Sequence, residues 1–152
     1  MIEIVVDDLS GADTQALIAL HLGAMQANSP PGHVFALGPA GLGRPDVTFW
    51  TARIGGRVAG MAALRHLGPH QGELKSMRTH PDHLRRGVAA ALLDHIVAEA
   101  RARFYRRLSL ETGSGPAFDP ALALYRRRGF VEGDAFGDYV KSDFNQFLHL
   151  AL

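Results

Sequence analysis

The stretch that decides the fold reads Glu73-Leu-Lys-Ser-Met-Arg-Thr-His-Pro-Asp-His-Leu-Arg-Arg-Gly-Val-Ala-Ala-Ala-Leu-Leu-Asp-His-Ile-Val97. An extended segment ends at His80-Pro81, a polar turn follows, and after Gly87 apolar residues recur at the spacing of one helix face. The pattern predicts a strand, a turn and an amphipathic helix that ends near Arg103. A helix N-terminus offers free backbone N–H groups to an anion, and Gly87 has no Cβ to obstruct it. The turn is therefore a candidate phosphate site, although glycine there also serves ordinary helix packing.

Composition limits the classes of protein that fit. With 152 residues, 47% of them apolar and 20% charged, the chain is expected to form one globular domain over 1–152. The formal charge of +1 gives no general case for nucleic acid or a membrane surface, so any anion site is local. The absence of cysteine excludes disulfides, thiol catalysis and cysteine zinc sites. An acidic start and the lack of a long apolar run predict a cytoplasmic protein without signal peptide or membrane span.

The first third of the chain predicts a strand, a helix and a long loop. Residues 2–6 form a β-branched run, and apolar spacing predicts a helix over 13–27 with Ser10 and Asp13 as a capping pair. The Gly/Pro-rich segment 28–45 is expected to pack onto the domain, either as a binding loop or as a surface insertion.

The middle of the chain predicts three antiparallel strands. Residues 47–54 and 57–64 are rich in β-branched and apolar residues, and Gly55-Gly56 between them favours a hairpin. The strand that carries Glu73 follows and completes a meander ahead of the helix that begins after Gly87.

The last third predicts a further strand, a helix and two more strands. The strand covers 107–112, and the helix has Asp119 as its N-cap, Pro120 as its first residue and Gly129 at its C-terminal end. The final strands are expected near 130–132, paired with 138–140, and at 144–150. The whole order predicts a mixed α/β fold whose sheet is part antiparallel and part parallel.

Two motifs in this order resemble the signatures of the GNAT superfamily of N-acetyltransferases. Leu84-Arg85-Arg86-Gly87-Val88-Ala89 is similar to the acyl-CoA signature Arg/Gln-x-x-Gly-x-Gly/Ala, and Tyr125-Arg-Arg-Arg-Gly129-Phe130 is similar to the second signature, Tyr-x-x-x-Gly-Phe. The resemblance covers essentially the whole chain and implies the GNAT fold, with a central sheet of about six to seven strands flanked by about four helices. Leu84 departs from the usual Arg or Gln, and Phe118 replaces an Asn that in relatives helps to hold the pantetheine arm.

The resemblance implies transfer of an acetyl group from acetyl-CoA to a primary amine by direct attack in a ternary complex. Such a reaction needs a base, because a protonated amine is not nucleophilic. Glu73 is the first candidate, since it matches the catalytic glutamate of histone acetyltransferases in the superfamily, and a solvated strand glutamate paired with Lys75 or an Arg is the structural alternative. Glu111, near the end of the neighbouring strand, is the rival base. Tyr125 is the implied general acid for the CoA thiolate.

The same resemblance assigns the donor site. The amide of Met77 would polarise the thioester carbonyl, and the backbone of the following residues would pair with pantetheine. The full set of implied donor-binding residues is Met77, Arg78, Thr79, Leu84, Arg85, Arg86, Gly87, Val88 and Ala89.

The acceptor is less constrained by the sequence. His33 and Tyr139 are candidate residues of the acceptor pocket, and a small amine is favoured over a basic peptide by the near-neutral charge. A protein or peptide acceptor and a non-catalytic acyl-CoA-binding module remain open alternatives, as does the oligomeric state, a homodimer included. The histidine pairs His66/His70 and His80/His83 fall in predicted turns without completing carboxylates, so no metal is expected.

Overall fold

The computed structural model describes residues 1–152 and contains one seven-stranded sheet in the order β1-β2-β3-β4-β5-β7-β6. The pairs are antiparallel except for β4 and β5, which run parallel, so the predicted mixed sheet is confirmed. The strands are β1 (Ile2–Val6), β2 (Val47–Ile54), β3 (Arg57–Gly68), β4 (Gln71–Thr79), β5 (Arg107–Thr112), β6 (Val131–Glu132) and β7 (Gln146–Ala151). The helices are α1 (Ala12–Asn28), α2 (Pro39–Leu42), α3 (Val88–Ala102) and α4 (Asp119–Arg127), with a 3₁₀ turn η1 (Pro81–His83) before α3.

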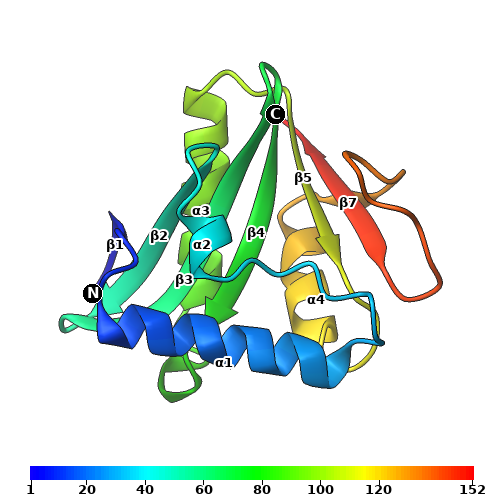
Figure 1. Ribbon diagram of the computed structural model, residues 1–152. Helices are drawn as coiled ribbons and strands as arrows, with labels where there is room; N and C mark the ends of the chain where they lie inside the picture. The colour runs from blue at the N-terminus through cyan, green and yellow to red at the C-terminus, as the bar shows by residue number, and fades with distance from the viewer.

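The helices cover both faces of the sheet (Figure 1). Successive side chains of a strand point to opposite faces, and each face of β2 and β3 is apolar. Trp50 and Ala62 belong to the larger core cluster with α3 and α4, whereas the adjacent Phe49 and Met61 pack with α1 and α2. The middle of β3, Val58–Leu64, is therefore a continuous buried run without a polar side chain, whereas β2 includes the buried Thr51, which bonds Asp7. None of the helices combines the length and hydropathy that a bilayer crossing requires.

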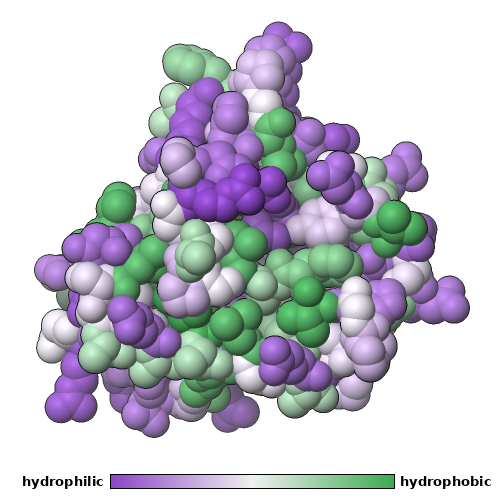
Figure 2. Space-filling view, viewed as in Figure 1, coloured by the Kyte–Doolittle hydropathy of each residue, from purple (hydrophilic) through white to green (hydrophobic).

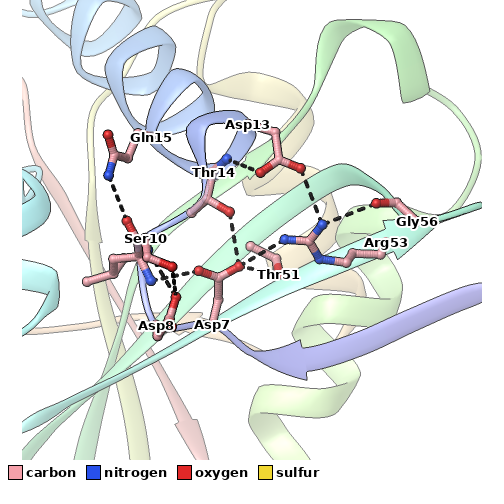
Figure 3. A network of polar contacts seen from close by, with 10 residues as sticks. Asp7, Asp8, Ser10, Asp13, Thr14, Gln15, Thr51, Arg53 and Gly56 are labelled. Carbon is pink, nitrogen blue, oxygen red and sulfur yellow. Dashed lines mark hydrogen bonds and ion pairs between the residues drawn. The ribbon is translucent and has the colours of Figure 1, made fainter.

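A polar network fixes the start of α1 to the sheet (Figure 3). Asp7 Oδ2 accepts hydrogen bonds from the hydroxyls of Thr14 and Thr51, both at 3.0 Å, and from Arg53 at 3.2 Å. The predicted capping pair is wrong: Gly11 is the N-cap, and the Ser10 hydroxyl donates to Asp8. Because Asp7, which directly follows β1, bonds Thr14 in the first turn of α1, the helix is held to the sheet without a side-chain cap at Gly11.

The hairpin and the long loop agree with the sequence. Gly55 and Gly56 both have positive φ, 57° and 78°, and Ile54 pairs with Arg57 across them, as a tight hairpin requires. The loop after α1 packs on the domain as expected, because it contains the one-turn helix α2 with Leu42 only 1% exposed. Apolar side chains gather across this face, over the segment that joins α1 to α2 (Figure 2).

The assignment of Asp119 as N-cap of α4 is wrong by one residue. Phe118 is the N-cap, in helical conformation, and Asp119 is the first helical residue. The reason lies in the preceding turn, where the Phe118 N–H donates to the Gly115 carbonyl, so that Phe118 already has a helical backbone conformation. The other end behaves as predicted, since Gly129 follows the C-cap with φ 94° and ends the helix.

The predicted strand at 138–140 is also wrong. Those residues form a turn and an irregular segment, and β6 pairs only with β7, through Val131 and Glu132. Tyr139 closes a turn by donating its N–H to the Phe136 carbonyl, and its side chain crosses to β4, where it contacts Glu73. That contact replaces the strand pairing expected from the sequence.

The sheet opens between β4 and β5. The two strands pair only over Gln71–Glu73 with Arg107–Ser109. Beyond these residues they diverge, so Leu74–Thr79 of β4 and Leu110–Thr112 of β5 have no partner in the other strand. The gap is the feature that positions the site.

Candidate active site

A cleft of about 700 Å³ occupies the gap between β4 and β5. Its walls come from α1, the loop after α1, β4, the start of α3, β5 and α4. The side toward α3 and α4 is called here the α3 face, and the side toward α1 the α1 face.

The start of α3 presents free backbone donors to the cleft. Ala91 is the first residue of this region whose N–H donates to a carbonyl, that of Gly87, and α3 has no side-chain cap. Arg85 and Gly87 both have positive φ, 62° and 78°, which turns successive N–H groups of the segment toward one side. A Cβ at Gly87 would meet no atom within 4 Å, so the approach to the backbone is open. The segment has the geometry of a phosphate-binding helix start.

A β-bulge lies on the β4 side of the cleft. Ala63 pairs with Lys75 and Met61 with Arg78, so Ser76 and Met77 together face the single residue Ala62. Ser76 adopts a positive φ of 56°, an uncommon conformation for a residue other than glycine. A bulge leaves its extra residue outside the ladder. The backbone at Ser76–Met77 is therefore available to a group bound in the cleft.

Tyr125 lines the cleft from α4 on the α3 face. Its side chain is 7% exposed, and its hydroxyl makes no hydrogen bond to another protein group. Burial raises the pKa of Tyr125 to about 12, against a smaller lowering effect of the Arg78 charge. The hydroxyl therefore keeps its proton at neutral pH and can donate it to an anion formed in the cleft.

Glu111 lines the cleft from β5 and has no ion pair or hydrogen bond to a protein side chain. Its neighbour Leu110 belongs to the α3-side core, so strand alternation turns Glu111 toward the α1 face. Burial raises the pKa of Glu111 to about 7, with a lowering effect of Lys75 and a further raising effect of Glu73. A carboxylate with this pKa can both accept and release a proton near neutral pH.

Glu73 lies at the end of the paired part of β4 and is 1% exposed. Its Oε2 accepts hydrogen bonds from the Tyr139 hydroxyl at 2.5 Å and from Lys75 Nζ at 3.2 Å, while its Oε1 is buried without a partner. Lys75 Nζ also donates to the Tyr139 oxygen at 2.7 Å. Burial, followed by the charge and hydrogen bond of Glu73, raises the pKa of Tyr139 well above its usual range. Tyr139 therefore acts as a donor to Glu73.

The structure brings most of the predicted site residues to the cleft. Those that line it are Met77, Arg78, Thr79, Leu84, Arg85, Gly87, Val88, Ala89, Glu111 and Tyr125. Four others are not in the lining: Glu73 is buried, His33 and Tyr139 are partly buried, and Arg86 is exposed to solvent. His33 packs edge-on against Phe144 with Nδ1 3.4 Å from the Ser142 hydroxyl, and so belongs to the loop contacts around the site.

Several lining residues were not predicted. Lys75 could have been found, because strand alternation places it on the same face as Glu73. His21 and Met25 of α1 carry no local signal, since they reach the cleft only when α1 crosses the sheet. Phe35 of the loop lines the cleft and packs edge-on against Tyr139, with ring centroids 5.3 Å apart. The histidine pairs have other contacts: His66 bonds Tyr105, and His80 accepts from the Asp82 N–H.

The whole arrangement matches known proteins along most of the chain. The model of the acetyltransferase (GNAT) family matches residues 14–130, which include the opened strands, the start of α3 and α4. The chain belongs to the GNAT family.

Two relatives extend this match. The uncharacterized N-acetyltransferase YsnE of Bacillus subtilis (strain 168) is 48% identical over 134 residues, which are 88% of this chain and 89% of the relative. The uncharacterized N-acetyltransferase YedL of Escherichia coli (strain K12) is 44% identical over 152 residues, 100% of this chain and 96% of the relative. This GNAT protein is accordingly an acyltransferase.

Solved structures show the same fold. A candidate acyl-CoA N-acyltransferase of Klebsiella pneumoniae superposes with a TM-score of 0.80 at 29% identity, covering 100% of this chain and 98% of the other. A GNAT acetyltransferase of Elizabethkingia anophelis with acetyl-CoA bound has a TM-score of 0.70 at 15% identity, covering 99% and 98%. The predicted GNAT fold, with seven strands and four helices, is confirmed.

The cleft of this GNAT protein fits acetyl-CoA. Pyrophosphate needs hydrogen-bond donors and positive charge, which the free N–H groups of α3, Arg85 and Arg127 provide. The unpaired stretch of β4 after Glu73 offers backbone to the pantetheine arm. Leu84 is 58% exposed and adds no polar group, and Phe118 packs edge-on against Phe144 with ring centroids 5.6 Å apart. Both departures from the family pattern thus leave the backbone cradle intact.

Proposed function

We propose that the protein transfers the acetyl group of acetyl-CoA to the primary amine of a small acceptor, by direct attack within a ternary complex in the single domain 1–152. The observation that carries the proposal is the free carboxyl of Glu111, with its pKa of about 7, across an open cleft from the bulge at Ser76–Met77. A base at one wall and unpaired backbone at the other are what amine acylation requires.

We assign the base to Glu111 rather than to Glu73. Glu111 lines the cleft and lacks a protein partner, whereas Glu73 lies behind the lining with Oε2 held by Lys75 and Tyr139. A base must reach the proton that it removes, directly or through one water. Glu73 has a different role in this proposal: its negative charge helps to raise the pKa of Glu111 into the useful range.

Acetyl-CoA supplies the thioester whose carbonyl carbon the amine attacks. Glu111 accepts the proton of the amine, the Met77 N–H hydrogen-bonds the carbonyl oxygen, and Tyr125 donates its proton to the departing thiolate. Proton transfer to Glu111 and from Tyr125 leaves the two side chains to re-equilibrate through solvent after the products leave. No covalent enzyme intermediate is needed, which agrees with the absence of cysteine.

A small acceptor is supported by the cover over the α1 face. Phe35 and Ala36 of the loop line the cleft beside His21 and Met25 of α1, so this side is walled by side chains. A walled pocket favours a compact acceptor over an extended peptide.

The test is a binding titration followed by a screen of acceptors. Acetyl-CoA should bind in calorimetry, and thiol release should appear with at least one small amine. Failure to bind at millimolar acetyl-CoA would refute the donor site. Binding without turnover on any amine, amino acid or peptide would favour a non-catalytic module, and turnover on peptides alone would contradict the small acceptor.

A further inference from the structure

Arg78 is a cation on the cleft wall without an acidic partner. It pairs with Met61, whose side chain packs with α1, so Arg78 lies on the α1 face. Its Nε donates to His21 Nδ1 at 2.9 Å, and Nη2 lies 3.9 Å from the Met25 sulfur. A guanidinium has five N–H donors, and the remaining ones, including both on Nη1, meet no protein acceptor.

The contact with His21 orients the guanidinium without neutralising it. Burial, with a smaller contribution from the Arg78 charge, lowers the pKa of His21 to about 4, so the imidazole is neutral and accepts at Nδ1. Burial also lowers the pKa of Arg78, but arginine stays charged in proteins. A partly buried positive charge with unused donors is suited to pair with an anionic group of a ligand.

The position of Arg78 relates it to the acceptor. Met77, whose N–H is proposed to bind the thioester carbonyl, is its neighbour in sequence, and Glu111 projects toward the same α1 face. The donor-binding segment of α3 and Tyr125 occupy the opposite face. Met25 of α1 and Phe35 of the loop give this wall an apolar part, beside the polar His21 and Asn28.

We propose, on the basis of the proposed function, that the acceptor is a free amino acid with an apolar side chain, whose carboxylate pairs with Arg78. Its amine is presented to Glu111, and its side chain contacts Met25 and Phe35. In the reaction the amine nitrogen forms a bond with the acetyl carbon, the C–S bond breaks, the ammonium loses its protons to solvent and to Glu111, and the thiolate takes a proton from Tyr125. Guanidinium and carboxylate match in shape and can form two parallel hydrogen bonds.

The test compares each acid with its own amide. L-leucine, L-methionine and L-phenylalanine are assayed by thiol release against the corresponding carboxamides, which keep the amine and side chain but lose the charge. We expect kcat/KM for the acids to exceed that for the amides by about 100-fold, the scale of a buried charge-assisted pair. Arg78→Gln should bring this ratio close to one without changing KM for acetyl-CoA, and Arg78→Lys should keep part of it. Arg57→Gln, an exposed arginine at the start of β3, is the matched control and should keep the full ratio.

The outcomes separate the two proposals. Amides turned over as well as acids would overturn the carboxylate site and leave the acetyltransferase proposal standing, and a preference for amides would point to peptides. An unchanged acid-to-amide ratio in Arg78→Gln, with a raised KM for acetyl-CoA, would assign Arg78 to the donor and also overturn the inference. Acetyl-CoA binding without any thiol release would refute the proposed function itself. If Arg78→Gln fails to fold, the acid-to-amide ratio of the wild type and its reduction in Arg78→Lys test the carboxylate site instead.

Discussion

Replacing Glu111 with Gln should lower activity and raise stability, and both effects should depend on pH. The folded-state pKa of Glu111 is about 7 against an ordinary 4.5, because burial disfavours the charged form. Gln has the shape of the protonated acid but cannot ionise. The variant therefore removes the base and, at the same time, the cost of holding a charge in the cleft.

The sign of the stability effect follows from the raised pKa. Below pH 4.5 the carboxyl is protonated in both states, and the two proteins should be equally stable at this site. As pH rises from 4.5 to 7 the unfolded chain ionises first, so the wild type loses stability relative to Glu111→Gln. The two pKa values differ by about 2.5, which at about 1.4 kcal/mol per unit sets an upper bound of about 3 kcal/mol. Solvent screening of the partly exposed carboxyl reduces this to about 1–2 kcal/mol above pH 7.

Urea denaturation of both proteins at pH 5 and pH 8 measures this difference. The advantage of Glu111→Gln should grow between the two pH values, and Glu3→Gln, an exposed carboxylate of β1, controls for the change in net charge. In the same variant kcat/KM should fall about 100-fold or more, and the rise of the wild-type rate through about pH 7 should disappear. A variant that is less stable than wild type at pH 8, or that keeps the wild-type pH profile, would refute the assignment of Glu111.

Four further variants test other parts of the structure. Tyr125→Phe should slow acyl transfer about 100-fold in a single turnover and leave the Kd for acetyl-CoA unchanged; an unchanged single-turnover rate would remove Tyr125 as the acid. Leu84→Gln supplies a polar side chain that the family signature usually has, and should tighten acetyl-CoA binding about 3- to 10-fold in calorimetry; weaker binding would contradict the predicted contact. Gly60→Ala should cost about 1–3 kcal/mol in urea denaturation, because its Cβ would lie 2.6 Å from Val88 Cγ1 and 3.0 Å from the Arg78 carbonyl. Gly23→Ala, mid-helix with no atom within 4 Å of the added Cβ, should instead raise the free energy of unfolding by about 0.5–1 kcal/mol. A Gly60→Ala variant as stable as wild type would contradict the close packing of β3 against α3.

Local patterns predicted the parts of the fold that depend on neighbouring residues. The tight turn at Gly55-Gly56 and the strand–turn–helix of 73–97 follow from spacing and turn chemistry, and the structure confirms both. The errors arise where a side chain distant in sequence makes the contact that a neighbouring residue was expected to make. Asp7 holds the start of α1 in place of Ser10, and Tyr139 bonds Glu73 of β4 instead of lying in the strand expected at 138–140.

The site was predictable to the extent that motifs mark it. The start of α3, Tyr125 and Glu111 were all found from sequence, and all line the cleft. The pairing of Arg78 with His21 was not, because 57 residues separate the two and neither stands in a motif. The preference of Glu111 over Glu73 also needed the structure, since the sequence cannot say which carboxylate is enclosed by its neighbours.

The three-residue pairing of β4 with β5 has a consequence for turnover. The contacts proposed for the donor, at the start of α3 and along β4, hold the pyrophosphate and the pantetheine arm and do not involve the acetyl group. In this proposed mode CoA would keep all of them after the acyl group has left, and it would bridge the two halves of a sheet that otherwise meet over Gln71–Glu73 and Arg107–Ser109. Dissociation of CoA thus requires all of these contacts to break together. We therefore expect release of CoA, rather than acyl transfer, to be the rate-limiting step of turnover.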